Sequence, residues 1–131
     1  MVDALGASLP TRWHYAPNGR LAAEDGPWPN DAVSYAYDPA GRRTALTAQL
    51  TATYTWTQGY AWDGAGRLAT ATLPGSLAYG YAYTNAAGLT AAPARLALPT
   101  GAYLTNRYDA VARLLATELR NPAHTILNSH A

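Results

Sequence analysis

A short motif that runs from aromatic residues to a glycine recurs along this chain, and it constrains the fold more than any other feature. The clearest copy is Tyr35-Ala36-Tyr37-Asp38-Pro39-Ala40-Gly41-Arg42. Tyr35 and Tyr37 are two residues apart, so in an extended strand their side chains lie on the same face. Asp38, the proline after it and Gly41 suit the first, second and fourth positions of a type I turn. The motif therefore predicts a β-hairpin.

Five copies of this hairpin motif follow one another. Their repeated positions are Tyr15, Gly19 and Arg20; Tyr35, Tyr37, Asp38, Gly41 and Arg42; Tyr60, Trp62, Asp63, Gly66 and Arg67; Tyr81, Tyr83 and Gly88; and Tyr108, Asp109 and Arg113. The anchoring aromatics, Tyr15, Tyr37, Trp62, Tyr83 and Tyr108, are spaced by 22, 25, 21 and 25 residues. The departures are Ala16 and Thr84 for the Asp, Leu89 for the Arg and Ala112 for the Gly. A period in the twenties that is kept over five copies indicates a repeat architecture.

The segments between the motifs also have the pattern of strands. Residues 46–54 alternate apolar and polar side chains, which is typical of a strand with one face inward. Residues 68–73 and 77–83 predict two further strands. Residues 111–120 have a helix-forming composition, but their register with the earlier copies favours a strand. Breaks rich in Pro, Gly and Asn are expected at residues 26–31, 74–75 and 98–101.

Composition agrees with an all-β, antiparallel strip of stacked hairpins that has open edges. The chain has ten Tyr and four Trp but no Phe, and Tyr- and Thr-rich sequences favour pleated, half-buried surfaces. Nine Arg, no Lys and eight acidic residues give a net charge of +1. This charge balance implies no electrostatic attraction to nucleic acid or to an anionic membrane surface. The absence of cysteine excludes disulfides and thiolate metal sites.

No set of residues points to catalysis, a metal or a cofactor, so we expect the chain not to be an enzyme. The three histidines lack metal-ligand spacing, and no serine has the context of a nucleophile. A Gly-Ala-Gly segment lies in a turn before a strand, where it does not form a phosphate-binding loop. The motif aspartates are expected to form turns. The histidines, the serines, the Gly-Ala-Gly segment and the motif aspartates are, in that order, His14, His124 and His130; Ser8, Ser34, Ser76 and Ser129; Gly64, Ala65 and Gly66; and Asp38, Asp63 and Asp109.

The motif Tyr-x-Tyr-Asp-x-x-Gly-Arg-Leu resembles the YD repeat of the RHS (rearrangement hotspot) proteins. These include bacterial polymorphic toxins, wall-associated proteins, toxin-complex components and animal teneurins. The resemblance covers residues 12–120 and implies hairpins that, in complete members, spiral into a hollow shell around a toxin or other cargo domain. Asp38-Pro39-Ala40-Gly41 is similar to a segment of the family's self-cleaving core. Here it lies in the second repeat and has a turn explanation, so autoproteolysis is not expected.

The expected organisation is a lead-in at residues 1–11, about five repeats at residues 12–120, and the start of a truncated repeat at residues 121–131. The last segment reads as a connection toward a further strand, with the next aromatic due near or just past residue 131. We therefore hypothesise a fragment of a longer repeat protein. No signal peptide or membrane-length apolar run is visible, while the resemblance implies a secreted or cell-surface protein. Open edges predict a marginal, oligomeric or aggregation-prone chain.

The predicted function is structural: a segment of a larger shell or scaffold that encloses or presents a toxin or cargo domain. Its predicted partners are further YD repeats of the same or a neighbouring chain. The alternative is a cell-surface adhesion or carbohydrate-binding module whose aromatic side chains stack on sugars. The tryptophans that would serve are Trp13, Trp28, Trp56 and Trp62. Aromatic side chains in strands usually pack across strands, which favours the structural interpretation.

Overall fold

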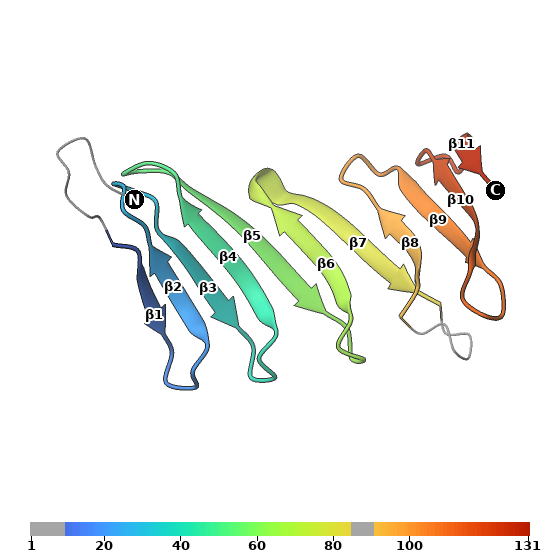
Figure 1. Ribbon diagram of the computed structural model, residues 1–131. Helices are drawn as coiled ribbons and strands as arrows, with labels where there is room; N and C mark the ends of the chain where they lie inside the picture. The colour runs from blue at the N-terminus through green and yellow to red at the C-terminus, as the bar shows by residue number, and fades with distance from the viewer. Residues whose placement is uncertain (1–9, 85–90) are drawn as a thin grey trace. The chain divides into compact units, whose positions relative to one another are not determined.

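The computed structural model describes residues 10–84 and 91–131, and these residues form a sheet of antiparallel strands (Figure 1). The strands are β1 (Arg12–Tyr15), β2 (Leu21–Asp25), β3 (Val33–Tyr37), β4 (Arg43–Gln49), β5 (Thr55–Trp62), β6 (Leu68–Leu73), β7 (Leu77–Tyr83), β8 (Pro93–Ala97), β9 (Tyr103–Tyr108), β10 (Leu114–Arg120) and β11 (Ile126–His130). Their order in the sheet is their order in the chain, from β1 to β11. The predicted open, antiparallel, all-β fold is confirmed.

The only helical element in the described residues is a 3-10 turn, Pro74–Ser76, between β6 and β7. It lies where the sequence predicts a Pro-Gly break. No helix in the described part of the chain is long and apolar enough to cross a membrane.

Two compact units divide the chain, residues 1–59 and residues 60–131, and β5 begins in the first and ends in the second. In the first unit the turns that join β1 to β2 and β3 to β4 lie at the same edge of the sheet (Figure 1). Register pairs Tyr35 with Leu46 and Ser34 with Thr47. Because strand side chains alternate, one face carries Tyr35 and Leu46 and the other carries the small polar residues.

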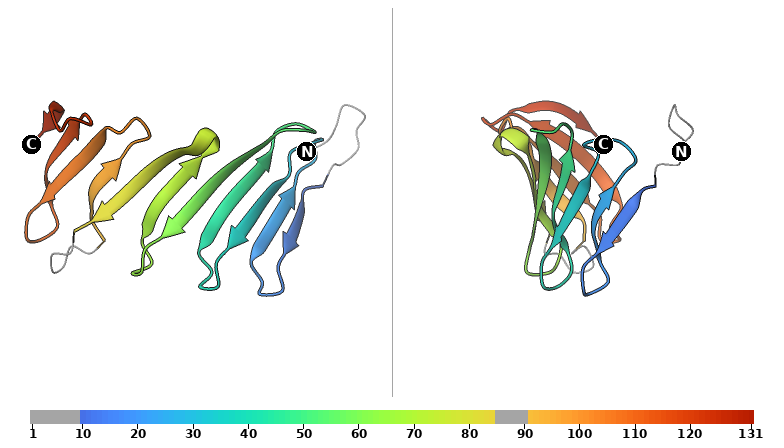
Figure 2. Two further views of the ribbon diagram at one scale, coloured as in Figure 1. Left: turned by 180° about the vertical axis from the view of Figure 1, so that it is seen from behind. Right: turned by 90° about the vertical axis from the view of Figure 1, so that its left-hand side faces the viewer.

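The second unit repeats this meander from β6 to β11. β6 pairs with β7 from Thr70↔Gly80 to Leu73↔Leu77, and β8 pairs with β9 from Arg95↔Thr105 to Ala97↔Tyr103. β10 lies between β9 and β11. In each unit the strands form a single layer (Figure 2). Accordingly, only Ala71 and Tyr103, each 7% exposed, are buried among the described residues.

Most strand predictions match the structure, and three details differ. The strand expected over residues 46–54 is wrong in its second half, because β4 ends at Gln49 and a turn follows. There Thr51 Oγ1 accepts hydrogen bonds from the backbone N–H of Thr53 and Tyr54, at 3.3 and 3.0 Å. Such a side-chain bond competes with strand pairing.

The other two differences concern the end of the chain. The predicted strand over residues 111–120 begins at Leu114, because residues 109–113 form the turn before β10. The segment after Asn121, which the sequence marks as a connection, contains β11, and this strand pairs with β10. Of the expected lead-in, residues 1–9 lie outside the described residues.

Candidate functional site

The turns of the motif share one backbone geometry. In the turn that joins β3 to β4, the Gly41 N–H donates to the Asp38 carbonyl at 2.8 Å, and the Asp38 N–H donates to the Arg42 carbonyl at 2.9 Å. Gly41 has φ +83°. This is a type I turn closed by a residue in the left-handed region, which is a common hairpin connection. The same two hydrogen bonds close the turns at residues 16–20, 63–67, 98–102, 109–113 and 121–125.

Two of these six turns lie outside the motif. They join β8 to β9 at residues 98–102 and β10 to β11 at residues 121–125. The sequence predicts a break at residues 98–101 and a connection after residue 120, but it does not identify either as the motif turn, since neither has the Asp-to-Arg pattern. Their left-handed residues are Gly101, with φ +83°, and His124, with φ +66°.

An aspartate and an arginine bind each other across three of the motif turns. Asp38 Oδ1 accepts from the Arg42 backbone N–H at 2.9 Å, and Asp38 Oδ2 accepts from Arg42 Nε at 2.7 Å. The same contacts join Asp63 to Arg67 at 2.9 and 2.7 Å and Asp109 to Arg113 at 2.9 and 2.6 Å. The backbone N–H of the arginine, followed by its guanidinium, holds the pKa of each aspartate below its usual range.

The first motif turn has Ala16 in place of the aspartate, and its arginine points elsewhere. Arg20 Cζ lies 5.8 Å from the centre of the Tyr37 ring, in the next hairpin. A Cβ atom at Gly41 would overlap the Arg20 guanidinium. The absence of a carboxylate at position 16 thus coincides with an arginine that connects two neighbouring hairpins.

Tyrosines of the motif bind the preceding hairpin through their hydroxyl groups. The Tyr37 hydroxyl donates to the Leu21 carbonyl at 2.9 Å, and the Tyr83 hydroxyl donates to the Leu68 carbonyl at 2.9 Å. Tyr108 donates in the same way to the Pro93 carbonyl at 3.1 Å. We call this arrangement the tyrosine contact. In each case the acceptor lies at or next to the first residue of the strand after a hairpin connection.

An arginine lies against the tyrosine ring in two of these contacts. Arg67 Cζ is 4.4 Å from the centre of the Tyr83 ring, and Arg20 takes the corresponding place at Tyr37. Burial raises the pKa of the Tyr83 hydroxyl. At Tyr37 and Tyr83 the tyrosine contact therefore combines a hydrogen bond with a cation–π interaction, which joins a hairpin to its neighbour by side chains as well as by backbone.

The remaining motif residues occupy several environments. Tyr35 donates to Glu24 Oε1 at 2.5 Å, and this hydrogen bond, more than burial, raises the pKa of Tyr35. Tyr15, at the end of β1, is 64% exposed. Tyr60 and Trp62 are half-buried on β5, and Tyr81 pairs with Leu96 across β7 and β8. Gly19 and Gly66 are the left-handed residues of their turns, and Gly88 lies outside the described residues.

The structure also shows a side-chain cluster that the sequence does not reveal. The hydroxyl of the buried Tyr103 lies 2.7 Å from His124 Nδ1, and Arg95 Cζ is 3.9 Å from the centre of the Tyr103 ring. Arg120 donates to the His124 carbonyl at 2.8 Å and pairs with Glu118. His124 and Tyr103 are 21 residues apart, so only the strand register brings them together.

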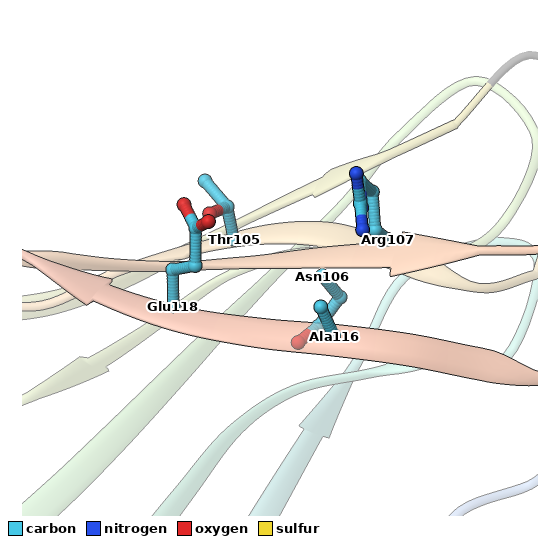
Figure 3. Close-up of a pocket in the computed structure, with 5 residues that line it drawn as sticks. All are labelled: Thr105, Asn106, Arg107, Ala116 and Glu118. Carbon is cyan, nitrogen blue, oxygen red and sulfur yellow. The ribbon is translucent and has the colours of Figure 1, made fainter. Parts of the chain in front are cut away.

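A hollow lies on β9 and β10 (Figure 3). Thr105, Arg107 and Glu118 project from the same side of the two strands, and Asn106 and Ala116 complete the lining. The Asn106 amide donates to the Pro93 carbonyl at 3.0 Å and accepts from Thr117 Oγ1 at 2.8 Å. Glu118 is held by Arg120, whose Nε and Nη2 donate to its Oε2 at 3.0 and 2.6 Å. In residues 10–84 and 91–131, no three His, Cys, Asp or Glu side chains gather in a way that would hold a metal.

Open sheets of this kind occur in toxin complexes of known structure. Over 89% of its length, the chain matches 7% of a chain from the Photorhabdus luminescens Tc holotoxin pore with a mutation in TccC3, at a TM-score of 0.70 and 15% identity. Crystal structures of TcdB2-TccC3 and TcdB2-TccC3-TEV match 91% of the chain at TM-scores of 0.49 and 0.46, with 14% identity each and 8% of those chains covered.

The likeness to the holotoxin chain establishes a shared fold. It confirms, at the level of fold, the resemblance to the RHS/YD-repeat proteins, since that resemblance implies antiparallel hairpins in a row. The chain spans less than a tenth of the proteins it matches. No family model matches the sequence, and no curated protein matches it significantly.

Proposed function

We propose that this chain is a structural RHS/YD-repeat segment of a larger shell or scaffold that encloses or presents a toxin or other cargo domain. The observation that carries the proposal is the recurrence of the tyrosine contact at Tyr37, Tyr83 and Tyr108. It joins successive hairpins at three of the five copies of the sequence motif. Repeat proteins are stabilised by such nearest-neighbour interfaces.

The charged side chains of the motif support a structural role. Asp38, Asp63 and Asp109 each bind the arginine four residues on, and their lowered pKa values keep them ionised rather than poised to donate a proton. In this proposal they form turns and the chain is not an enzyme. The fold shared with part of a Tc holotoxin agrees with the toxin-complex components among the proteins that the motif resembles.

The proposed organisation follows the contacts. Residues 12–120 form about five repeats, residues 121–131 begin another, and further YD repeats of the same or a neighbouring chain are the partners. The proposed site of action is outside the cell or at its surface, as in the bacterial toxins that the motif resembles.

The experiment that tests the shell is protection of a cargo. The reading frames on either side of the gene are sequenced, and the chain is co-expressed with the candidate cargo they encode. We expect neighbouring frames that encode further YD repeats, and a cargo domain that resists added protease until the shell is denatured. Neighbouring frames without such repeats, together with a cargo cleaved at the same rate with and without the chain, would refute the proposal.

Glycan binding is the second candidate function, and it is favoured by two exposed tryptophans of the first unit. Trp13 is 58% exposed and Trp28 is 51% exposed. Rings that are open to solvent suit stacking on sugars, whereas the tyrosine hydroxyls of the motif are engaged within the sheet. A glycan array with the parent chain and Trp28→Ala tests this role. Absence of any signal from the parent would exclude it.

A further inference from the structure

The turn between β1 and β2 contains a dipeptide whose side chain and backbone can react with each other. Asn18 is the only asparagine in the chain that precedes a glycine. Asn18 and Gly19 are both exposed. Apart from the residues next to Gly19 in the chain, no heavy atom of the described residues lies within 4 Å of the place that a Cβ at Gly19 would take. Because Gly19 carries no side chain, its backbone nitrogen can approach the amide carbon of Asn18 with little steric hindrance.

The folded turn polarises the Asn18 amide. The Arg20 backbone N–H donates to Asn18 Oδ1 at 3.1 Å. When a nucleophile adds to an amide carbon, negative charge develops on the amide oxygen, and a donor already placed at that oxygen stabilises the charge. The backbone of Arg20 therefore activates the Asn18 side chain toward attack.

One hydrogen bond holds the attacking nitrogen. The Gly19 N–H donates to the Ala16 carbonyl at 2.8 Å. An amide nitrogen attacks only after it has lost its proton, so this hydrogen bond opens before the reaction begins. The strand pairs between β1 and β2 lie beyond the turn and can stay in place. Opening of the turn alone is therefore sufficient.

A similar dipeptide in the turn between β5 and β6 is protected. Asp63 precedes Gly64, but both of its carboxylate oxygens are held. Oδ1 accepts from the N–H groups of Ala65 and Arg67 at 2.9 Å each, and Oδ2 accepts from Arg67 Nε at 2.7 Å. The lowered pKa of Asp63 keeps it ionised, and a carboxylate resists attack because it already carries negative charge. Asp63 is thus an internal comparison for Asn18.

We propose that Asn18 is a site of spontaneous deamidation, and that the isoaspartate formed there loosens the β1–β2 hairpin. The deprotonated Gly19 nitrogen bonds to Asn18 Cγ, and the side-chain nitrogen leaves as ammonia with the proton that Gly19 lost. The product is a cyclic imide. This chemistry does not depend on the proposed role as a shell segment.

Water then opens the imide at one of its carbonyl carbons. The water oxygen bonds to that carbon, the bond from the carbon to the Gly19 nitrogen breaks, and the nitrogen takes up a proton from the water. Breaking the bond to Cγ gives aspartate and restores the original backbone. Breaking the bond to the backbone carbonyl carbon gives isoaspartate, in which the chain runs through Cβ and Cγ and is longer by one carbon.

A longer backbone does not fit this turn. The Gly19 N–H donates to the Ala16 carbonyl and the Ala16 N–H donates to the Arg20 carbonyl, both at 2.8 Å, with Gly19 at φ +80°. An extra carbon changes the ring that these hydrogen bonds close, so isoaspartate should lose them. Leu21, whose carbonyl binds the Tyr37 hydroxyl, follows directly after the turn. The first tyrosine contact therefore loses part of its support.

The first test follows the asparagines of the full chain over time. The purified chain is incubated at neutral and at mildly alkaline pH and is then mapped by peptide mass spectrometry. Asn18 is expected to convert before the other asparagines and to give mainly isoaspartate. Conversion should be faster at the higher pH, because hydroxide removes the Gly19 proton. Asp63 should remain aspartate.

A matched pair of variants tests the activation by the Arg20 N–H. Ala16→Asp installs the aspartate of the other motif turns, where Oδ1 binds the backbone N–H of the arginine. The new carboxylate should take this N–H from Asn18 and slow the conversion about fivefold, the effect of one hydrogen bond. Ala40→Asp adds the same charge at an exposed residue of the β3–β4 turn and should leave the rate unchanged.

The second test compares the two products. The isoaspartate form is isolated from the aged chain by ion exchange, and Asn18→Asp supplies the aspartate form with an unchanged backbone length. Amide hydrogen exchange over residues 12–25 should be about fivefold faster, or more, in the isoaspartate form than in the parent. Asn18→Asp should exchange like the parent, and the amides of β9 and β10 should be unaffected in both forms.

Each part of the proposal has a result that would overturn it. An Asn18 that stays intact, or that converts no faster than the other asparagines, would exclude the site. An isoaspartate form that exchanges like the parent would exclude the loosening of the hairpin, and equally fast exchange in Asn18→Asp would assign it to charge instead of backbone length. Equal rates in the parent and in Ala16→Asp would exclude the role of the Arg20 N–H.

Discussion

At the scale of single residues, the hairpins depend on backbone positions that most side chains disfavour. Gly19, Gly41, Gly66 and Gly101 have φ between +78° and +83°, while Ala112 and His124 take φ +66° at the same place in their turns. An L-residue in the left-handed region is strained by contact between its Cβ and the backbone. The glycines of the motif are therefore required by geometry, and Ala112 marks a turn that bears this strain.

The turn between β5 and β6 offers a matched pair of glycines for a test. Gly66 has φ +78°, whereas Gly64 lies outside the left-handed region and has open space around the position of a Cβ. We expect Gly66→Val to lower the free energy of unfolding by about 1–2 kcal/mol or more, and Gly64→Val to change it much less. Urea unfolding of both variants measures the difference. Equal midpoints would contradict the turn geometry.

A second pair isolates the contact between neighbouring hairpins. Gly19 and Gly41 have nearly the same φ, but only at Gly41 does Arg20 occupy the space of a Cβ. Gly41→Ala must displace the Arg20 guanidinium from the Tyr37 ring. It should therefore cost about 0.5–1 kcal/mol more than Gly19→Ala. In an Arg20→Ala background the two substitutions should cost the same, and a difference that persists there would exclude Arg20 as its cause.

At the scale of elements, the Asp–Arg pairs link hairpin stability to pH. The pKa of Asp38, Asp63 and Asp109 is lowered in the folded chain, mainly by the backbone N–H of the arginine. Each folded pKa lies below the unfolded value of about 3.9. The stabilisation is therefore present above that value and is lost as the pH falls through the folded pKa. We expect a melting temperature that is level near neutral pH and declines below pH of about 4.

A variant with asparagine at all three positions provides the comparison for this pH profile. Asparagine keeps an acceptor oxygen in the turn but carries no charge that titrates. The melting temperature of this variant should be lower than that of the parent at neutral pH. The fall in melting temperature on acidification should be smaller for the variant than for the parent. If parent and variant lose stability in parallel below pH of about 4, other carboxylates must control the acid transition.

The sequence predicts these elements well where turn chemistry is explicit. Asp38 with its proline and Gly41 predicts the β3–β4 turn, and the Pro-Gly break after residues 68–73 predicts the end of β6. It fails at residues 50–54, where the alternation continues although the Thr51 hydroxyl binds the backbone and ends the strand. The tyrosine contacts and the Tyr103–His124 pair depend on register between strands, which no local pattern specifies.

At the scale of the whole molecule, stability comes from neighbouring strands because the described residues contain almost no enclosed core. Ala71 on β6 and Tyr103 on β9 are the buried residues, whereas every residue of β1 and of β11 is exposed. In an array of this kind, each strand is held mainly by the strands beside it. Among the described strands, β1 and β11 have one neighbour each, and they are the least protected places in their units.

Amide hydrogen exchange tests this view of the molecule. In dilute solution we expect the amides of β1 and β11 to exchange fastest in their respective units, because local opening costs least free energy where few contacts are lost. The amides around Ala71 and Tyr103 should exchange slowest. Uniform protection across β1 to β11 in dilute solution would show that the strands unfold only together, and would contradict a stability built from neighbouring pairs.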